Sequence, residues 1–404
     1  MRRTGRHILM VLDHPYPPDV RVENEARSLV EAGFEVSLLA LAPDDRPALD
    51  EHEGTTVYRA IVPTKMRNVM RGLVSTLPLM DLYLARQIRG VYEQHPFGAL
   101  HMHDLYLVGA GLRAGRRLGV PVVADLHENW VEALKHYAWS NRYPGKLVVN
   151  IPRWERTERR WVRAADRLVV VIEEAAARYA AMGVPRDRIT VVPNTVHLGA
   201  FRGFEIEEAL VDRLRSRLTL VYTGGIDAHR GLETVVDAMP AILRTEPKAR
   251  LVIVGDGRTK PELEERAVAL GLGERVSFEG WQPQARLKSY IAAADVCLVP
   301  HLKTVHTDAT IPHKLFHYMF MRKPVVVTNC RPLERIVEDA TAGLVYSSGD
   351  AEALTEAVLH LHRNPQACAE MGERGHRAVV EQYHWDATVR GLVAMYDNLL
   401  PARE

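Results

Sequence analysis

The sequence predicts an α/β protein built from two doubly wound domains of similar length, and three observations support this. Short apolar runs, in which polar and apolar residues do not alternate, are separated along the chain by segments of helical periodicity. This pattern is typical of parallel sheets covered by helices on both faces. A charged stretch without a strand pattern interrupts the series between about residues 197 and 217. The chain has 404 residues, 47% of them hydrophobic, which is enough for two domain cores.

In the first half, apolar runs predict buried strands that alternate with helices. The strands are expected at residues 7–12, 35–41, 99–103, 121–126, 167–172 and 189–193. A first helix is expected at residues 19–33, where apolar residues recur at helical spacing and Gly33 provides the stop signal. A helix at residues 154–166 carries Trp154 and Trp161 at a spacing that favours burial in the core.

The second half repeats this architecture. Its strands are expected at residues 218–224, 249–255, 275–280, 296–300, 324–329 and 343–347. We place the two domains at residues 1–197 and 198–383. Residues 384–404 are expected to form one amphipathic helix that packs either on the second domain or, by crossing back, on the first. Because parallel sheets bind ligands at the carboxyl ends of their strands, the site is expected in a cleft between the domains.

Composition argues against several classes of protein. The formal net charge is +1, so the overall charge gives no signal for nucleic acid. The apolar run at residues 8–12 is too short for a secretory signal, and no stretch reaches the roughly 18 apolar residues of a membrane span. The three cysteines are widely spaced, which favours a reduced, cytoplasmic protein without a metal finger.

Two glycine-containing turns follow strands in the second half. Gly224 and Gly225 precede a helix that starts near Gly231, and Arg230 lies just before it. Glycines allow the backbone to approach a phosphate closely, so these residues indicate either a phosphate site or a tight turn with a solvated arginine. Asp256, between two further glycines, is either a ligand contact or the cap of its own turn.

A third turn, HTDATIPHKLFHYMF, opens another helix. Thr310, Ile311 and Pro312 lie at its expected N-terminus, where free N–H groups and the helix dipole favour an anion. Lys314 lies in the first turn and is expected to contact the same anion. Together with Gly225 and Arg230, this helix predicts a diphosphate site in the second domain.

The first half places polar residues at strand ends. Asp125 and His127 should share one side of their strand by alternation, and His127 is either a site residue or a buried, hydrogen-bonded histidine. Glu128 is an acceptor contact or a helix cap, and Asp104 lines the acceptor pocket or caps the next helix. As a less favoured alternative, His101, His103, Asp104, His127 and Glu128 form a metal-ligand set.

Two further segments of the first half carry candidate contacts. In the loop HPYPPDVRVENEA, Asp19, Arg21 and Glu25 are candidates for touching the acceptor or the diphosphate, although a solvated helix start also explains Asp19 and Glu25. Residues 64–90 mix basic residues with Met, Leu and Tyr. This segment is either a membrane-interface element that meets a lipid-linked acceptor or an ordinary helix pair packed on the sheet.

Taken in order, these stretches resemble the GT-B glycosyltransferases of the retaining, GT4-like group. The resemblance is carried by YPPDVRVENEARSLVEAGFEV, HMHD, PVVADLHE, ADRLVVVIEEAAARYAAMGV, ITVVPNTV, GGIDAHRGLETVVDAM, LVIVGDG, VSFEGWQPQARLKSYIAAADVCLVP and KLFHYMFMRKPVVVTNC. It spans nearly the whole chain, and although each motif alone is weak, the ordered set is specific. It implies the GT-B fold, with a nucleotide-sugar donor on the C-terminal domain and an acceptor on the N-terminal one.

The resemblance also implies roles for individual residues. His127 corresponds to the family histidine that meets the transferred sugar, and Arg230 and Lys314 would act with it by stabilising the leaving diphosphate. Two family glutamates that contact the sugar and ribose are absent: Ala309, next to Asp308, and His317 stand in their places, so Asp308 and His317 are expected to substitute. Trp281 lies where the family holds the base and either stacks on it or packs in the core.

The expected activity is therefore transfer of a hexosyl-type residue, with retention of configuration, from a UDP- or GDP-sugar to an acceptor hydroxyl. The acceptor is a glycan, a lipid-linked saccharide or a small molecule, and no metal or other cofactor is expected. The expected location is the cytoplasm, including the inner face of the cell membrane. Two alternatives remain: a non-catalytic protein that binds sugar nucleotides or glycans, and a sugar-nucleotide epimerase of the same fold.

Overall fold

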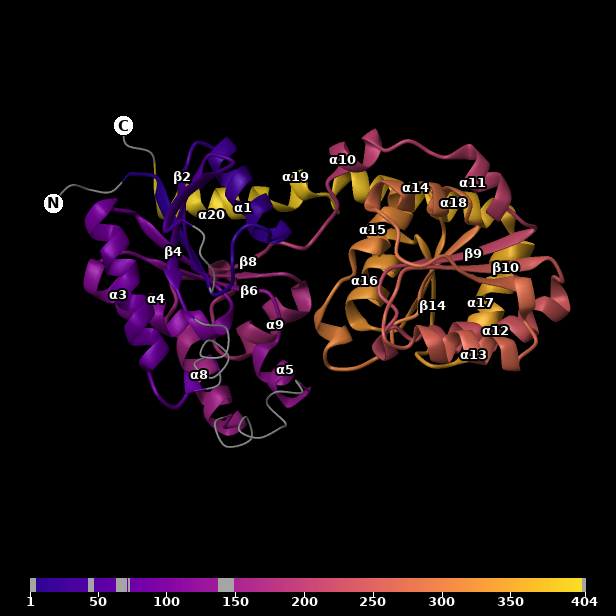
Figure 1. The fold of residues 1–404 in the computed structure, drawn as a ribbon, viewed down its shortest axis with the longest axis horizontal. Coiled ribbons are helices and arrows are strands. Elements are labelled where there is room, and N and C mark those ends of the chain that lie inside the picture. The colour runs from indigo at the N-terminus through magenta and orange to yellow at the C-terminus, as the bar shows by residue number, and fades with distance from the viewer. Residues whose placement is uncertain (1–4, 43–46, 63–70, 72, 137–148, 402–404) are drawn as a thin grey trace. The chain divides into compact units, whose positions relative to one another are not determined.

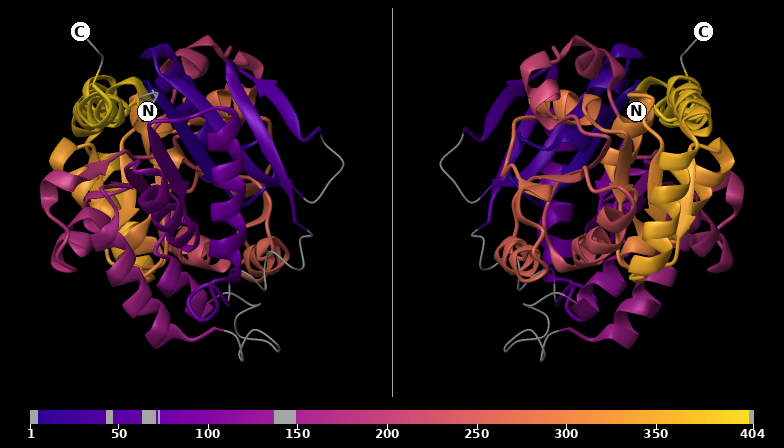
Figure 2. Two further views of the ribbon diagram at one scale, coloured as in Figure 1. Left: turned by 90° about the vertical axis from the view of Figure 1, so that its left-hand side faces the viewer. Right: turned by 90° about the vertical axis from the view of Figure 1, so that its right-hand side faces the viewer.

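The computed structural model describes residues 5–42, 47–62, 71, 73–136 and 149–401. Two compact units make up the chain: Met1–Val192 together with Val389–Glu404, and Pro193–Thr388. The sequence prediction divides the domains after residue 197, whereas the compact units divide after Val192. In each unit, helices lie on both sides of a sheet (Figures 1 and 2).

The first unit contains an eight-stranded sheet of order β3-β4-β2-β1-β5-β6-β7-β8. Its strands are β1 (His7–Leu12), β2 (Glu35–Ala42), β3 (Leu49–His52), β4 (Thr55–Ile61), β5 (Ala99–His103), β6 (Val122–Leu126), β7 (Arg167–Val170) and β8 (Ile189–Val191). The main helices are α1 (Val20–Glu31), α3 (Leu79–Gln94), α4 (Leu105–Leu118), α5 (Trp130–His136), α8 (Ile151–Ala164) and α9 (Glu173–Ala181). Every strand that the apolar runs predicted in the first half is present.

The hairpin of β3 and β4 was missed by the sequence prediction, which also expected parallel strands alone. β4 pairs in parallel with β2, but β3 pairs with β4 in antiparallel fashion. β3 is polar and mostly exposed, and β4 has buried and partly exposed residues in alternation over most of its length. A search for continuous apolar runs detects strands buried on both faces and passes over such edge strands.

The second unit contains a six-stranded, wholly parallel sheet of order β11-β10-β9-β12-β13-β14. Its strands, all of them expected, are β9 (Leu218–Thr223), β10 (Ala249–Val254), β11 (Val276–Phe278), β12 (Val296–Val299), β13 (Val325–Thr328) and β14 (Gly343–Tyr346). The helices are α10 (Leu198–Gly203), α11 (Glu208–Leu214), α12 (Leu232–Thr245), α13 (Lys260–Ala269), α14 (Gln284–Ala292), α15 (His313–Phe320), α16 (Arg331–Ala340), α17 (Ala351–Arg363) and α18 (Pro365–Glu381).

The single helix expected at residues 384–404 is wrong. The segment forms two short helices, α19 (Trp385–Thr388) and α20 (Arg390–Leu399), which belong to different units. Trp385 is buried in the second unit, where its backbone N–H donates a hydrogen bond to the carbonyl of Val196. α20 belongs to the first unit and buries Tyr396 there. Val389 alone separates the two helices, and the buried residues on either side of it pack in different units.

Two further findings concern helices of the first unit and of the chain as a whole. Trp154 and Trp161 lie in the core of the first unit, which confirms the burial that their spacing predicted. Among the helices of the described residues, none is both long and apolar enough to cross a membrane.

Candidate active site

The turn after β9 brings the backbone of the second unit close to a lysine. Gly224 has φ = +124°, a value that favours glycine. A Cβ atom at this position would lie 2.7 Å from the Nζ atom of Lys314. The backbone conformation therefore favours glycine at residue 224, and a side chain there would have to displace the ammonium group of Lys314. The next residue, Gly225, accepts a hydrogen bond of 2.6 Å at its carbonyl from the hydroxyl of Tyr222.

Lys314 is a buried lysine beside this turn. It lies in the first turn of α15, is only 9% exposed, and its Nζ atom has no hydrogen-bond partner. The ammonium instead lies 3.5 Å from the ring centroid of Tyr222, a cation–π contact. Burial, reinforced by the positive charge of Arg230, lowers the pKa of Lys314 well below its usual value. A buried cation without an acceptor favours the binding of an anion.

Arg230 is held by a histidine that the sequence analysis did not identify. Arg230 Nη1 donates to Nε2 of His301 at 3.0 Å, while its buried Nε has no partner. His301 follows Pro300 in the loop after β12 and is 1% exposed. Burial and the neighbouring Lys314 and Arg230 keep the pKa of His301 well below its usual value, so the ring is neutral and accepts the hydrogen bond.

Five more residues were predicted for the donor: Thr310, Ile311 and Pro312 for the diphosphate, and Asp308 and Asp256 for the sugar, ribose or base. Pro312 is the N-cap residue of α15, with Thr310 and Ile311 before it. Asp308 faces a different element, because its Oδ1 accepts from the backbone N–H of Arg331 at 2.9 Å at the start of α16. Asp256 Oδ1 accepts a hydrogen bond of 2.9 Å from the backbone N–H of Gly257. This bond corresponds to the alternative in which Asp256 caps its own turn.

Two residues predicted to contact the sugar, ribose or base have contrasting environments. His317 is 9% exposed and stacks on Phe201, with ring centroids 4.5 Å apart. Burial and the nearby His313 lower its pKa to about 4, so His317 is neutral at pH 7 and does not reproduce the charge of a glutamate. Trp281 is 73% exposed; the alternative that it packs in the core is wrong.

In the first unit, His127 lies between two carboxylates. Its Nε2 lies 2.7 Å from Asp125 Oδ2, and its Nδ1 lies 3.8 Å from Asp104 Oδ1. Burial lowers the pKa of His127, but Asp125 and Asp104 outweigh burial and raise it to about 9. The imidazole is therefore protonated at pH 7. Asp125 and His127 share one side of the strand end, as alternation predicted.

Arg21 lies inside the same buried cluster. Its Nη2 is 3.1 Å from Asp125 Oδ1 and 2.8 Å from Glu25 Oε1, and its Nη1 donates to the carbonyl of Val192 at 3.0 Å. The side chains of Arg21, Glu25 and Asp125 are 8%, 0% and 0% exposed, respectively. The structure thus gives Arg21 and Glu25 partners within the unit, where the sequence had suggested contacts with the acceptor or diphosphate.

The remaining acceptor candidates lie at helix starts. Asp19 is the N-cap of α1 and accepts from the N–H groups of Arg21 and Val22, which confirms the helix-start interpretation. Asp104 occupies the N-cap position of α4 without a side-chain capping bond, and it accepts from the hydroxyl of Tyr106 at 2.9 Å. Glu128 is partly buried ahead of α5.

The metal-ligand set considered from the sequence corresponds only in part to a cluster in the structure. Glu25, His101, His103 and Asp125 are buried, and one potential ligand atom from each lies within 4.8 Å of the others. Arg21 contacts both carboxylates, and the protonated His127 contacts Asp125. These two cations already balance the two carboxylate charges, so the donor set does not require a divalent cation.

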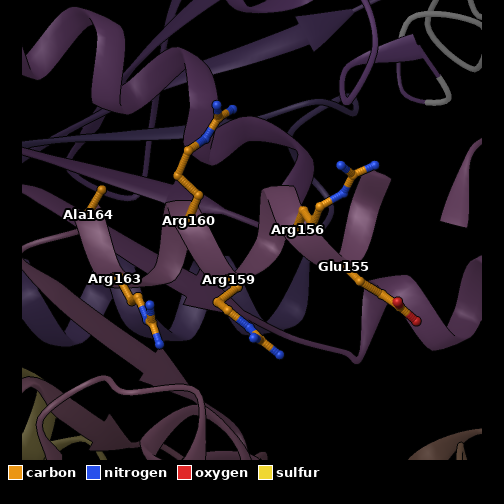
Figure 3. Close-up of a pocket in the computed structure, with 6 residues that line it drawn as sticks. All are labelled: Glu155, Arg156, Arg159, Arg160, Arg163 and Ala164. Carbon is orange, nitrogen blue, oxygen red and sulfur yellow. The ribbon is translucent and has the colours of Figure 1, made fainter. Parts of the chain in front are cut away.

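A strongly basic groove lies apart from these residues on α8. Figure 3 shows Arg156 and Arg160 on one side of this helix and Arg159 and Arg163 on the other. The groove of about 570 Å³ is lined by Glu155, Arg156, Arg159, Arg160, Arg163 and Ala164. None of the predicted site residues lines it, and we assign it no role in donor or acceptor binding.

Comparison with known proteins identifies the class. A model described as "Glycosyltransferase Family 4" matches residues 19–199, and one described as "Glycosyl transferases group 1" matches residues 217–364. Together they account for most of both units. The chain belongs to this family of GT-B glycosyltransferases, as the ordered motifs had indicated, and it is therefore a glycosyl-transferring enzyme.

Individual relatives and solved structures agree with this assignment. A D-inositol 3-phosphate glycosyltransferase of Acidothermus cellulolyticus is 28% identical over 99% of this chain and 92% of its own length. A 2-deoxystreptamine glucosyltransferase of Streptomyces kanamyceticus is 23% identical, covering 94% of this chain and 98% of that protein.

Among solved structures, the fold is similar to that of sucrose-phosphate synthase from Thermosynechococcus elongatus, with a TM-score of 0.73, 19% identity and coverage of 97% and 98%. It is also similar to Anabaena Alr3699/HepE, solved in complex with UDP, with a TM-score of 0.71, 14% identity and coverage of 97% and 100%.

Arg230→Ala should weaken binding of UDP far more than binding of uridine. Loss of one charge-assisted contact corresponds to about 1.5–3 kcal/mol, or roughly 10- to 150-fold in Kd. Titration calorimetry with both ligands measures the difference. Arg258→Ala is the matched control, because Arg258 is 90% exposed and pairs only at the surface with Asp227. Equal losses for UDP and uridine would instead assign Arg230 to the fold.

Proposed function

We propose that this enzyme transfers a sugar from a nucleoside diphosphate sugar to an acceptor hydroxyl with retention of configuration and without a metal ion. The observation that carries the proposal is Lys314, a buried ammonium without a hydrogen-bond acceptor beside Gly224. Arg230, also carrying an unpartnered buried nitrogen, belongs to the same unit. A diphosphate supplies the acceptors that both cations lack.

Charge in this reaction develops on the leaving diphosphate. The bond between the anomeric carbon and the phosphate oxygen breaks, while the acceptor oxygen forms its bond on the same face of the sugar. The acceptor proton passes to an oxygen of the departing phosphate. Lys314, Arg230 and the N–H groups at the start of α15 stabilise this negative charge, which is the work that a metal ion performs in other transferases.

The proposed donor is a UDP- or GDP-sugar. UDP is favoured because Anabaena Alr3699/HepE, similar in fold, was solved with UDP. His127 is the first-unit residue proposed to meet the transferred sugar, with Asp104 and Glu128 on the acceptor side. The relatives named for inositol phosphate and deoxystreptamine favour a polyhydroxylated acceptor, either a free small molecule or part of a larger glycan or lipid-linked saccharide.

A panel of UDP-, GDP- and ADP-sugars tests the donor. An increase in the Tm of the protein should identify the nucleotide base of its donor. The correct donor should also be hydrolysed slowly to free sugar when no acceptor is present. Product analysis with the correct acceptor should then show retained anomeric configuration in the presence of a chelator. Binding without turnover would favour a non-catalytic protein, and an epimerised sugar nucleotide would favour the epimerase alternative. Absence of a shift with every nucleotide would contradict the proposal.

UDP binding should be accompanied by proton uptake. The pKa of Lys314 in the free protein is lowered by burial and by Arg230, and the negative diphosphate raises it again. Between these two pKa values the complex binds more protons than the free protein, so affinity should fall as pH rises. Calorimetry in buffers of different ionisation enthalpy measures the uptake, which Lys314→Met should reduce. Unchanged uptake in that variant would assign the protons to other groups.

We also propose peripheral contact with a membrane through residues 64–90. The segment lies partly outside the described residues, and Arg71 pairs with Asp13 within the first unit. The described part nevertheless exposes apolar side chains at the start of α3: Leu79 is 57% exposed and Leu82 is 46% exposed. Exposed Arg86 and Arg89 follow at helical spacing, a combination typical of interfacial helices.

The double variant Leu79→Glu, Leu82→Glu should therefore reduce co-sedimentation with vesicles containing phosphatidylglycerol. Both side chains are exposed, so thermal stability should change little. Val268→Glu is the matched control, because Val268 is 78% exposed and belongs to the second unit. Equal sedimentation of the wild-type protein with neutral and anionic vesicles, or none with either, would remove the proposal.

A further inference from the structure

The protonated His127 depends on a carboxylate that lies entirely inside the first unit. Asp125 is 0% exposed and is the next-to-last residue of β6. Its Oδ2 lies 2.7 Å from His127 Nε2, 3.1 Å from His103 Nδ1 and 3.4 Å from His101 Nε2. Burial raises the pKa of Asp125, but Arg21 and His127 outweigh burial and keep it well below its usual value.

The charges around His101 favour one position for its ring proton. An ionised carboxylate only accepts hydrogen bonds, and the short one to Asp125 comes from His127 Nε2. Nε2 of His101 has no hydrogen-bond partner of its own, but it faces two buried carboxylates, Asp125 Oδ2 at 3.4 Å and Glu25 Oε2 at 3.6 Å, and their negative charge favours a proton on this nitrogen. In a neutral ring, Nδ1 of His101 is then without a proton and accepts a hydrogen bond.

That hydrogen bond comes from the C-terminal helix. The hydroxyl of Tyr396, on α20, lies 2.6 Å from His101 Nδ1. Tyr396 is 0% exposed, and its ring packs against Phe34, with centroids 5.8 Å apart. A donor at Nδ1 fixes the tautomer of His101, in the way that an outer hydrogen bond fixes the orientation of a histidine ligand.

We infer that Tyr396 and His101 are positioning residues for His127, acting through Asp125. The hydroxyl of Tyr396 keeps the Nε2–H of His101 directed at the buried carboxylates. Together with Arg21, this N–H keeps the carboxylate of Asp125 in the orientation in which it contacts His127. The inference rests on the proposed function of His127 for its effect on turnover. It also gives the C-terminal helix a functional role: α20 carries a residue of the network behind the catalytic histidine.

The groups that face His127 come from several elements. Asp125 lies near the end of β6, His103 and Asp104 lie at the end of β5, and Arg21 is on α1. Glu25, beside Arg21, is buried, and burial raises its pKa to about 7, although Arg21 opposes the shift. Of the carboxylates near this histidine, Asp125 makes the short contact, so its charge should dominate the proton affinity of His127.

Nitrogen-15 NMR of the histidine rings tests the network without any substrate. In the wild-type protein, His101 should be the Nε2–H tautomer. Tyr396→Phe should produce a mixture of tautomers at His101 and a several-fold lower kcat, with the donor KM unchanged. Asp125→Asn should lower the pKa of His127 by about 1–3 units. If Asp125→Asn fails to fold, Tyr396→Phe still tests the inference, since it removes one oxygen and keeps the ring.

Tyr179→Phe is the matched control. Tyr179 is 2% exposed and donates to the buried Glu158 at 3.2 Å in the same unit, so this variant also loses one buried hydroxyl bond. It should leave the tautomer of His101 and kcat unchanged. An unchanged His101 tautomer and kcat in Tyr396→Phe would overturn the inference.

Elemental analysis adds a second decisive outcome. One equivalent of a divalent metal in the purified protein, lost in His101→Gln, would mean that the histidine nitrogens ligate a cation instead of donating to Asp125, and it would also overturn the inference. Failure of the proposed function is recognised separately: absence of UDP binding and transfer, with the expected tautomers and titrations intact, leaves the network in place.

Discussion

Lys314→Met is expected to lose most of the affinity for UDP while the protein remains folded. The ammonium of Lys314 is buried without an acceptor, so the free protein carries the cost of desolvation and the diphosphate supplies the missing partner. Each charge-assisted hydrogen bond that is lost corresponds to about 1.5–3 kcal/mol, or roughly 10- to 150-fold in Kd. Titration calorimetry should show this loss for UDP and little change for uridine.

Thermal unfolding distinguishes lost binding from lost folding. Methionine fills the same space and leaves no hydrogen-bond partner behind, so the Tm of the unliganded variant should equal or exceed that of the wild-type protein. Lys323→Met is the matched control: its Nζ donates to the carbonyls of Ala292 and Ala294. This variant should lower Tm and keep UDP affinity. Wild-type UDP affinity in Lys314→Met would mean that α15 does not receive the phosphate.

His127→Asn is expected to reduce kcat by roughly 10²- to 10³-fold, the range seen when one preorganised electrostatic group is removed. UDP affinity should stay within about twofold, because the proposed phosphate contacts all belong to the second unit. The pKa of about 9 adds a pH test. If the imidazolium is the active form, turnover should fall as pH rises through about 9, where the proton is lost.

The matched control for His127→Asn is His95→Asn. His95 also pairs with a carboxylate in the first unit, at 2.8 Å from Glu35, but its side chain is 38% exposed. This variant should retain activity and its pH dependence. A comparable loss of kcat in both variants, or a loss of UDP affinity equal to the loss of kcat in His127→Asn, would contradict a specific role for His127 in turnover.

Most residues of the proposed donor site could be predicted from the sequence because their signals are local. A parallel strand, a glycine turn and the start of a helix are consecutive in the chain, so Gly224, Arg230 and Lys314 could be assigned from short motifs. His301, immediately beyond β12, obeyed the same rule of strand carboxyl ends and could have been proposed. No motif, however, indicates that its ring accepts from Arg230, since 71 positions separate the two residues.

The role of Arg21 shows a different limit of sequence analysis. A charged residue near a helix start is usually solvated, and only packing reveals that Arg21 is enclosed by Glu25 and Asp125. The replacement of a family glutamate by His317 was visible in the sequence, but its consequence was not. Stacking on Phe201 and burial make this side chain a neutral ring, so it does not compensate for the lost carboxylate by charge.

The sequence by itself determined the two-sheet architecture, the positions along the chain of the strands that are buried on both faces, and the turns that we propose for phosphate binding. These features depend on hydrophobic periodicity and on residues that are neighbours in the chain. The tertiary structure decided the edge hairpin of β3 and β4, the division of the last segment between two units, and the network of Tyr396, His101 and Asp125. Tyr396 and His101 are 295 positions apart. A contact of this kind leaves no local pattern, because it exists only when α20 packs on the first unit and burial makes each polar atom require a partner.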